Sequence, residues 1–326
     1  MRSTKSKVTT EQAAEILLSA QSVALFSHVR PDGDTVGAAS ALCLALRKAG
    51  KNVALFCSDE LSDGLKKFPL SLQYSQTFFG KYDLMVAVDC GDVFRLGDFS
   101  GVYDRFFNTM TIDHHGGETY SRYSCLESYA STCQIIYEIL PRLQVEMDEE
   151  IATYLYMGLC TDTGNFSNSS TDAASFAMAA ELCRHNADRQ KVYRVFFSDT
   201  TFGVARLWGK AMSCMRSYYD GKLILLYITA QDLKQYGAQP SDSEGIVQNA
   251  IAVDTAIGGV SLCEYAENSF KVSMRGKDFN VRDICRQFGG NGHVVAAGCM
   301  INGLLEDVIE KIVRAFGIAF EDERIC

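Results

Sequence analysis

Four short segments of the chain carry side chains that could bind metal ions. They read HVRPDGD over 28–34, VDCGD over 88–92, DHH over 113–115 and CTDTG over 160–164. Histidine is scarce, with five in 326 residues, yet two of these segments contain three of them. The candidate ligands are His28, Asp32, Asp34, Asp89, His114 and Asp162. Each segment alone could be a solvated turn, but four in order at the ends of expected strands and helices favour a metal centre.

The donor set indicates which metal and which reaction. Two imidazoles and four carboxylates, without a thiolate, suit Mn²⁺, with Mg²⁺ or Co²⁺ as substitutes, and do not suit structural zinc. In an extended loop Asp32 and Asp34 would point to opposite sides, which predicts two neighbouring sites. Two cations about 3.5–4 Å apart that share a carboxylate can promote in-line displacement at phosphorus.

A fifth segment, GGNGHVVAAG over 289–298, could bind an anion. Gly289, Gly290 and Gly292 would let the backbone approach a ligand and offer N–H groups to it, and His293 could hydrogen-bond a phosphate. The alternative is a glycine-rich helix C-cap, at least for the first two glycines. Arg275, at a strand end, could face the same ligand or simply be solvated. His185 is expected at a helix end, outside any cluster.

The elements that must position these residues alternate between strands and helices. Short apolar runs at 23–27, 52–57, 83–88 and 109–112 predict strands. The segment 28–37 is expected to form a loop, and a helix is expected to follow it over 38–48. Helices are expected at 9–18, 131–140, 148–159, 172–184 and 188–197. After a boundary near 198–202, the expected order is helix 202–217, strand 223–229, helix 244–256, hairpin 259–275, helix 280–288, strand 299–301 and helix 305–320. This predicts an α/β fold with a mostly parallel sheet in 1–198 and a smaller α/β domain in 199–326.

Composition narrows the functional class. The net charge of −9 disfavours a protein that grips long duplex nucleic acid, but a short anionic ligand remains compatible with a metal-filled site. Twelve cysteines without any CxxC pair are interpreted as reduced thiols. Residues 1–10 are polar, unlike a secretory signal, and the longest apolar run, near 223–229, is too short to span a membrane. We therefore expect a cytoplasmic protein with no membrane association.

In order and spacing, the first four segments resemble the motifs of the DHH phosphoesterase superfamily. The GGNGHVVAAG segment is similar to the glycine-rich motif of the associated DHHA1 domain, usually GGGHxxAAG, although Asn291 interrupts the glycine run. The resemblance spans nearly the whole chain, and the compact layout is similar to the nanoRNase group. It implies a DHH catalytic domain over 1–198 and a DHHA1 substrate-binding domain over 199–326.

The resemblance also implies roles for individual residues. His28, Asp32 and Asp89 would bind a first Mn²⁺, and Asp34, Asp89, His114 and Asp162 a second, with Asp89 bridging. A hydroxide activated by both cations would be the nucleophile. His115 would sit beside the reacting phosphate as a catalytic residue, and Arg275 and His293 would bind the terminal phosphate or sugar. Expected substrates are short RNA, linear dinucleotides such as pApA, or 3′-phosphoadenosine-5′-phosphate (pAp), and a homodimer is possible.

Three alternatives remain open. The same residues could serve a cyclic di-AMP phosphodiesterase, or a DHH-type inorganic pyrophosphatase, although the glycine-rich segment disfavours the latter. A catalytically silent nucleotide-binding sensor is a different class; it should have lost metal ligands, and all six are present.

Overall fold

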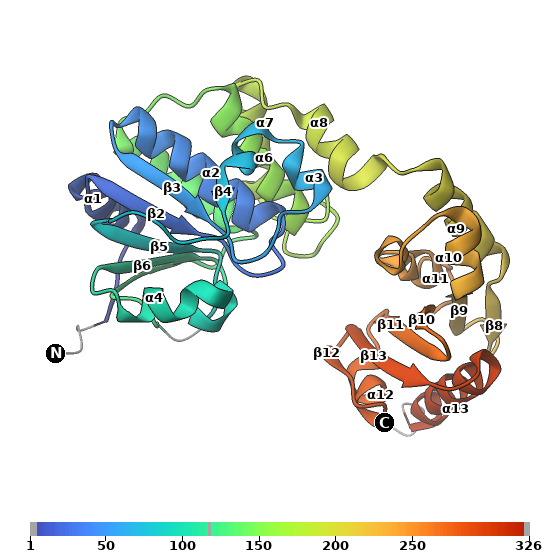
Figure 1. The fold of residues 1–326 in the computed structure, drawn as a ribbon. Coiled ribbons are helices and arrows are strands. Elements are labelled where there is room, and N and C mark those ends of the chain that lie inside the picture. Colours follow the sequence, from blue (N-terminus) through green and yellow to red (C-terminus); the bar gives the residue numbers. More distant parts are fainter. Residues whose placement is uncertain (1–4, 117–118, 323–326) are drawn as a thin grey trace. The chain divides into compact units, whose positions relative to one another are not determined.

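A computed structural model of the chain describes residues 5–116 and 119–322. It forms two compact units, the first ending at Asp199 and the second beginning at Thr200 (Figure 1). Each unit has its own sheet and its own buried apolar cluster. The α/β fold class expected from the sequence is confirmed.

The first unit is built on a seven-stranded sheet with every neighbouring pair parallel, in the order β1-β7-β6-β5-β2-β3-β4. The strands are β1 (Ser6–Lys7), β2 (Ser22–Phe26), β3 (Asn52–Phe56), β4 (Tyr74–Ser75), β5 (Leu84–Val88), β6 (Thr109–Asp113) and β7 (Tyr123–Leu126). The chain runs outward from β2 through β3 to β4, then returns to β5 and continues the other way. The strand order therefore reverses between β2 and β5, and such a switch point is where open α/β sheets bind ligands.

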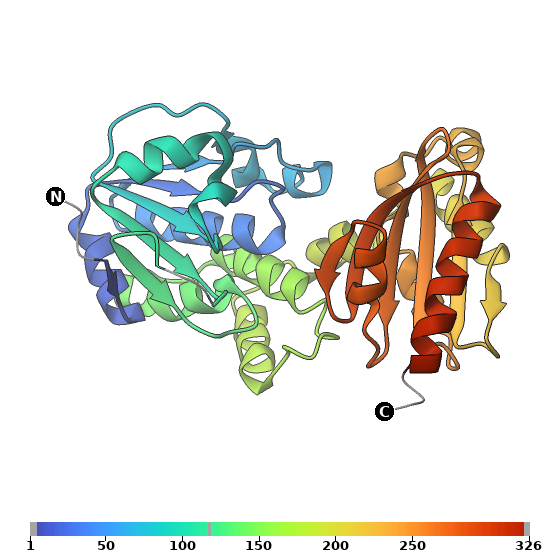
Figure 2. The same ribbon diagram turned by 90° about the horizontal axis from the view of Figure 1, so that it is seen from below.

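Helices cover both faces of this sheet, which explains why its central strands are continuous apolar runs (Figure 2). The helices are α1 (Thr10–Ser19), α2 (Gly33–Lys48), α3 (Asp63–Lys66), α4 (Ser100–Arg105), α5 (Thr132–Ile139), α6 (Glu149–Asp162), α7 (Ala173–Arg184) and α8 (Arg189–Tyr193). One face packs aliphatic side chains of α1, α2, α5 and α6. The other is aromatic, with the rings of Phe26 and Phe56 stacked at 5.2 Å and Tyr103 of α4 edge-on to Phe26.

Two glycines allow α2 and α6 to pack closely against each other. A Cβ on Gly37 would lie 2.5 Å from the carbonyl oxygen of Tyr154, and one on Gly158 would lie 2.5 Å from Oδ1 of Asp34. No larger residue fits either position without displacing backbone or a buried carboxylate. This close approach sets Asp34 on α2 near Asp162, the last residue of α6.

The second unit has a mixed six-stranded sheet in the order β12-β13-β11-β10-β9-β8, with only β9 and β10 parallel. Its strands are β8 (Arg216–Tyr218), β9 (Leu223–Ile228), β10 (Gly258–Ala266), β11 (Ser269–Gly276), β12 (Asn291–His293) and β13 (Ala296–Asn302). Its helices are α9 (Phe202–Ser213), α10 (Ala230–Tyr236), α11 (Val247–Ile251), α12 (Val281–Gln287) and α13 (Leu305–Asp322). α12 and α13 pack on one face, and α9, α10 and α11 cover part of the other.

Several expected elements are corrected. Helix α2 starts at Gly33 rather than at 38, because the Asp32 side chain accepts hydrogen bonds from the N–H groups of Asp34 and Thr35 and caps it. The helix expected over 244–256 shrinks to α11, since Glu244 is extended and Gly245 has a φ of 81°. The last strand is longer than 299–301 and pairs with β12, so part of the glycine-rich segment is a strand.

Three further expectations, on membrane helices, cysteines and His185, can be compared with the structure. Among the described residues no helix is both long and apolar enough to cross a membrane. The eleven cysteines within the described part of the chain are free thiols, and most are buried. His185 is the C-cap of α7, as expected.

Candidate metal centre

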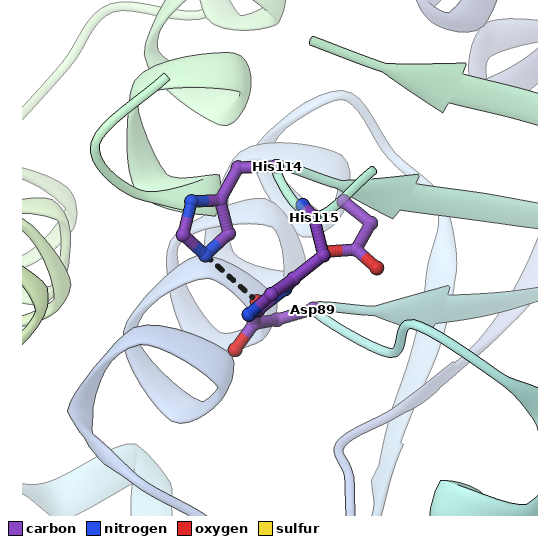
Figure 3. Close-up of side chains that lie close together, drawn as sticks. Asp89, His114 and His115 are labelled. Atoms are coloured by element: carbon purple, nitrogen blue, oxygen red, sulfur yellow. Dashed lines mark hydrogen bonds and ion pairs between the residues drawn. The ribbon is translucent and has the colours of Figure 1, made fainter. Parts of the chain in front are cut away.

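The candidate ligands gather where neighbouring parallel strands end. His28 follows β2, Asp89 follows β5 and His114 follows β6, so the three arrive at one edge of the sheet. Figure 3 shows the imidazole of His114 directed at the Asp89 carboxylate, with His115 beside it. The remaining carboxylates come from the start of α2 and the end of α6.

The six residues form two clusters joined by Asp89. In one, Nε2 of His28 lies 3.6 Å from Oδ2 of Asp32 and 3.4 Å from Oδ2 of Asp89. In the other, Nε2 of His114 lies 3.2 Å from Oδ2 of Asp162 and 3.6 Å from Oδ1 of Asp89. Asp34 completes the second cluster. Donor atoms of His28, Asp32 and Asp89 lie within 4.8 Å of one another, and so do those of Asp34, His114 and Asp162. Asp89 is linked to this second group through the contact of its Oδ1 with His114. The two oxygens of Asp89 thus face different clusters.

The imidazoles are oriented as metal ligands. Nδ1 of His28 donates to the carbonyl of Val29 at 2.8 Å, and Nδ1 of His114 donates to the carbonyl of Tyr129 at 3.0 Å. A proton on Nδ1 leaves a lone pair on Nε2. Both Nε2 atoms are buried and have no hydrogen-bond partner among the residues that the structure describes. A buried polar atom without a partner is costly, and a cation bound between the carboxylates would satisfy both. The donor set therefore fits divalent cations.

The side chains of Asp32 and Asp34 contribute to different clusters, but not for the reason expected from the sequence. They do not alternate along an extended loop. Asp32 is the N-cap of α2 and is half-exposed, whereas Asp34 lies in the first helical turn and is fully buried. The helix start, rather than strand alternation, directs the two carboxylates to different clusters.

The N-terminus of α5 holds two carboxylates that sequence reasoning did not connect to it. The N–H groups of Thr132 and Cys133 donate to Oδ2 and Oδ1 of Asp34 at 2.6 and 3.0 Å, and the Thr132 hydroxyl donates to Oδ1 of Asp89 at 3.0 Å. A helix N-terminus stabilises negative charge. The available signal was Ser131–Thr132 at the start of the expected helix over 131–140, since Ser and Thr are typical of helix starts.

Without cations the centre retains protons. Burial raises the pKa of Asp162 to about 8, with the charge of Asp89 adding to the effect. Burial and the Asp89 and Asp162 charges raise the pKa of Asp34 well above its usual value. Burial opposes the charged form of His28, but Asp32 and Asp89 outweigh it and raise its pKa to about 9. For Asp89 burial is likewise outweighed, by the neighbouring imidazoles of His115 and His28, so its pKa falls well below the usual value. Crowded acidic groups of this kind mark functional sites.

His115 is held by Asp113. Nδ1 of His115 donates to Oδ1 of Asp113 at 2.8 Å, and Asp113 also accepts from the His115 backbone N–H at 3.0 Å. Asp113 and then Asp89 raise the pKa of His115 to about 10. Asp89, Asp113, His114 and His115 also lie close enough to form a donor group, but Asp113 is already engaged with His115. His115 is thus a half-exposed cation at the rim of the two clusters.

Backbone strain marks Asp89. Its φ of 60° is left-handed, a conformation that non-glycine residues rarely adopt, although Asp and Asn tolerate it best. Directly before it lies the buried strand β5. Strain of this kind is concentrated at functional sites, and here it falls on the carboxylate that both clusters share.

The candidate substrate residues lie in the second unit. Arg275 and His293 are both opposite Ala296, Arg275 on β11 and His293 on the edge strand β12. The N–H groups of Gly289 and Gly290 donate to the carbonyls of Arg286 and Cys285 and cap α12. These two N–H groups are therefore not free to bind an anion, as the C-cap alternative anticipated. A role for Gly292 in backbone approach stays a prediction.

Comparison with known proteins now decides the family. The model of the DHH family, N-terminal domain, matches residues 22–159. A Thermus thermophilus protein named "Bifunctional oligoribonuclease and PAP phosphatase NrnA" is 30% identical, over 93% of this chain and 91% of its own. The chain belongs to the DHH family. This DHH protein is a phosphoesterase, a hydrolase of phosphoester bonds, from a metal-dependent family.

Further relatives match over most of their length, and two solved structures share the fold. Proteins of the same name from Mycoplasma genitalium and Bacillus subtilis are 27% and 24% identical, over 89% and 86% of this chain and 94% and 89% of theirs. The crystal structure of an exopolyphosphatase-related protein from Bacteroides fragilis superposes with a TM-score of 0.84 at 24% identity, covering 96% of this chain and 95% of that one. RecJ from Thermus thermophilus, solved with Mn²⁺, has a TM-score of 0.51 at 13% identity, over 94% of this chain and 54% of RecJ. Both structures show a shared fold.

Proposed function

We propose that this DHH phosphoesterase hydrolyses very short oligoribonucleotides and linear dinucleotides such as pApA to mononucleotides, and removes the 3′-phosphate of pAp. The observation that carries the proposal is the pair of clusters sharing Asp89, since such a pair is suited to displacement at phosphorus. Relatives that match this chain nearly end to end bear the name oligoribonuclease and PAP phosphatase. The net charge of −9 favours a small substrate over a long polymer.

The proposal assigns each cluster one cation. His28, Asp32 and Asp89 would hold the first, and Asp34, Asp89, His114 and Asp162 the second. Mn²⁺ is the metal that we propose, because a set of carboxylates with one imidazole per cluster suits it. When bound, the cations supply Lewis acidity at the phosphoryl group and lower the pKa of an attacking water.

The remaining residues position the reaction. Thr132 orients Asp89, while the N-terminus of α5 holds Asp34 in place. His115, which Asp113 keeps protonated through Nδ1, would use its other nitrogen to stabilise charge on the phosphate or to protonate the leaving 3′-oxygen. In the second unit, we propose residues 199–326 as the substrate-binding domain, with Arg275 and His293 binding the terminal phosphate. The first 198 residues would form the catalytic domain.

The test is an activity panel with Mn²⁺ on the purified protein: pApA, an RNA trinucleotide, pAp, cyclic di-AMP and pyrophosphate. Mononucleotides from pApA and the trinucleotide, with phosphate from pAp, are expected. Turnover of pyrophosphate alone would replace the proposal with a pyrophosphatase. Turnover of cyclic di-AMP in preference to pApA would replace it with a cyclic dinucleotide phosphodiesterase. Mn²⁺ binding without turnover of any of the five would contradict it and favour a sensor.

A further inference from the structure

The end of α9, the first helix of the second unit, brings an amine and a thiol into contact (Figure 1). Lys210 lies in the last turn of this helix, and Cys214 is its C-cap. Residues four apart on a helix lie on the same face. Nζ of Lys210 donates a hydrogen bond to Sγ of Cys214 at 2.7 Å. The two atoms are therefore closer than the ~3–3.5 Å that separates reacting atoms in a near-attack arrangement.

Cys214 differs from the other cysteines in its access to solvent and in its neighbouring charge. Among the eleven that the structure describes, only Cys183 and Cys214 are not buried. Cys183 lies on α7, and within the described residues no lysine donates a hydrogen bond to its thiol. Burial opposes the charged form of Cys214, but the neighbouring Lys210 outweighs it and lowers the pKa of the thiol. A thiolate reacts with oxidants far faster than a thiol does, so Cys214 is the described cysteine best suited to oxidation.

Lys210 is held at the end of α9 by groups from two further elements. Its ammonium lies 4.0 Å from Oδ1 of Asp232 on α10 and 6.0 Å from the ring centroid of Tyr227 on β9. Arg216 lies 5.1 Å from the same ring centroid, but Glu306 pairs with it through hydrogen bonds of 2.6 and 2.7 Å. Lys210 is therefore the cation that is available to the thiol.

The reactivity of Cys214 depends on this lysine, because its position in the fold opposes a negative charge. The backbone N–H of Cys214 donates to the carbonyls of Lys210 and Ala211, at the C-terminal end of the helix. A helix C-terminus carries partial negative charge and disfavours an anion, as partial burial also does. The Lys210 ammonium offsets both effects, and without it Cys214 should be an ordinary thiol.

We infer that Lys210 and Cys214 form a peroxide-sensitive pair, in which oxidation joins Nζ to Sγ through a sulfenamide cross-link. The Cys214 thiolate attacks hydrogen peroxide, so an S–O bond forms and the O–O bond breaks. The departing hydroxide takes a proton from the Lys210 ammonium and becomes water. The freed amine then attacks sulfur: an S–N bond forms, the S–O bond breaks, and the second hydroxide leaves with a proton from nitrogen as water. Sulfur loses two electrons to the peroxide, and sulfenic acids condense with nitrogen in this way.

The cross-link protects the sulfur and changes the charge around it. A sulfenic acid that stays exposed to peroxide is oxidised further to sulfinic and sulfonic acids, which are not readily reversed. A sulfenamide belongs to the reversible stage of cysteine oxidation, and thiols reopen it. The same step removes the Lys210 charge that faces Asp232. The pair is thus a reversible modification site, and it operates independently of the proposed hydrolysis.

The test follows peptide masses after the full chain has been exposed to peroxide. The reduced protein is treated with hydrogen peroxide in EDTA, and catalase ends the reaction before digestion with trypsin. We expect a loss of about 2 Da in a peptide over 207–216 that trypsin leaves uncut after Lys210. Dithiothreitol should restore both the mass and the cleavage. A loss of about 2 Da found only in other peptides, as a disulfide would give, would overturn the inference.

Variants separate activation of the thiol from capture by the amine. In Lys210→Arg the cation remains, but a guanidinium stays protonated and does not attack sulfur. We expect Cys214 to be oxidised within about 3-fold of the wild-type rate in this variant, and to stop as a sulfenic acid that gains about 16 Da and reacts with dimedone. Lys210→Met should slow the oxidation of Cys214 by about 10-fold, because the thiolate fraction falls. Cys183→Ser is the matched control and should form the cross-link as the wild type does.

Several results would contradict the inference. These are a wild-type Cys214 that gains oxygen without the cross-link, a Cys183 that is oxidised as fast as Cys214, and a Lys210→Met variant that reacts at the wild-type rate. A gain of about 14 Da over 207–216, which an oxygen retained between nitrogen and sulfur would give, would overturn the S–N bond. Thermal unfolding of each variant is measured beforehand, and Lys210→Arg keeps the test decisive if Lys210→Met does not fold.

Discussion

The metal centre of the first unit and the edge strand β12 of the second differ in how firmly their polar groups are held. Asp34 accepts hydrogen bonds at both oxygens, Asp89 is strained and buried, and His28 and His114 are anchored through Nδ1. On β12, at the edge of its sheet, Asn291 and His293 are exposed. Cations require donors at fixed positions, whereas a nucleotide can be met by side chains that adjust. We therefore expect changes in the first region to abolish chemistry and changes in the second to alter affinity.

The largest effect should come from Asp89→Asn. Asn tolerates the left-handed backbone of residue 89 but cannot bridge two cations as a carboxylate does. We expect pApA hydrolysis to fall by more than ~100-fold, beyond the ~10–100-fold typical of partners that only orient ligands. Asp92→Asn is the control in the same loop, because Asp92 caps the next segment through the N–H groups of Phe94 and Arg95, a role that Asn can take. Comparable losses in both variants would argue against a shared carboxylate.

A smaller effect is expected from Thr132→Val, which removes the hydroxyl that donates to Asp89 and keeps the side-chain shape. Mn²⁺ affinity, measured by calorimetry, should weaken by ~10–100-fold. Ser131→Ala tests the neighbouring buried hydroxyl, for which the described part of the chain offers no hydrogen-bond partner, and should change affinity little. The orienting role of Thr132 would be wrong if both variants bound Mn²⁺ as the wild type does.

The second region should respond differently to His293→Ala. We expect the KM for pApA to rise by about 10-fold, as loss of a hydrogen bond to a charged group implies. Mn²⁺ affinity should stay unchanged, because His293 lies on β12 and no described metal cluster includes it. A matching loss of Mn²⁺ affinity would remove the distinction between the two regions.

The smallest effect is a pH dependence of the metal-free protein. Asp162, His28 and His115 all have pKa values raised on folding, to about 8, 9 and 10. The folded protein therefore binds more protons than the unfolded chain between about pH 6.5 and 8, and its stability should fall as the pH rises through that window. In EDTA we expect Tm to drop by a few degrees from pH 6.5 to pH 8, as measured by calorimetry. Asp162→Asn should flatten this slope, and a Tm that rises with pH would contradict the assignment.

Much of the first unit could be predicted from local pattern. Buried parallel strands are apolar runs, and β2, β3, β5 and β6 all fell within a residue or two of their expected positions. The short strands β1, β4 and β7 were missed, because pairing with a neighbour rather than their own composition makes them strands. The same holds for β12, where pairing with β13 turns a glycine-rich segment into an edge strand.

By itself the sequence determined which chemistry is available and where it enters the fold. The six candidate ligands, the α/β alternation and the position of each ligand after a strand or at a helix end follow from residue type and order. Only the tertiary structure decided how they combine. It turned the two oxygens of Asp89 toward different histidines, brought the start of α5 onto Asp34 and aligned Asn291 with Ser273 across Gly298. Such contacts join residues distant in the chain, and they depend on strand register and helix approach, which local sequence does not specify.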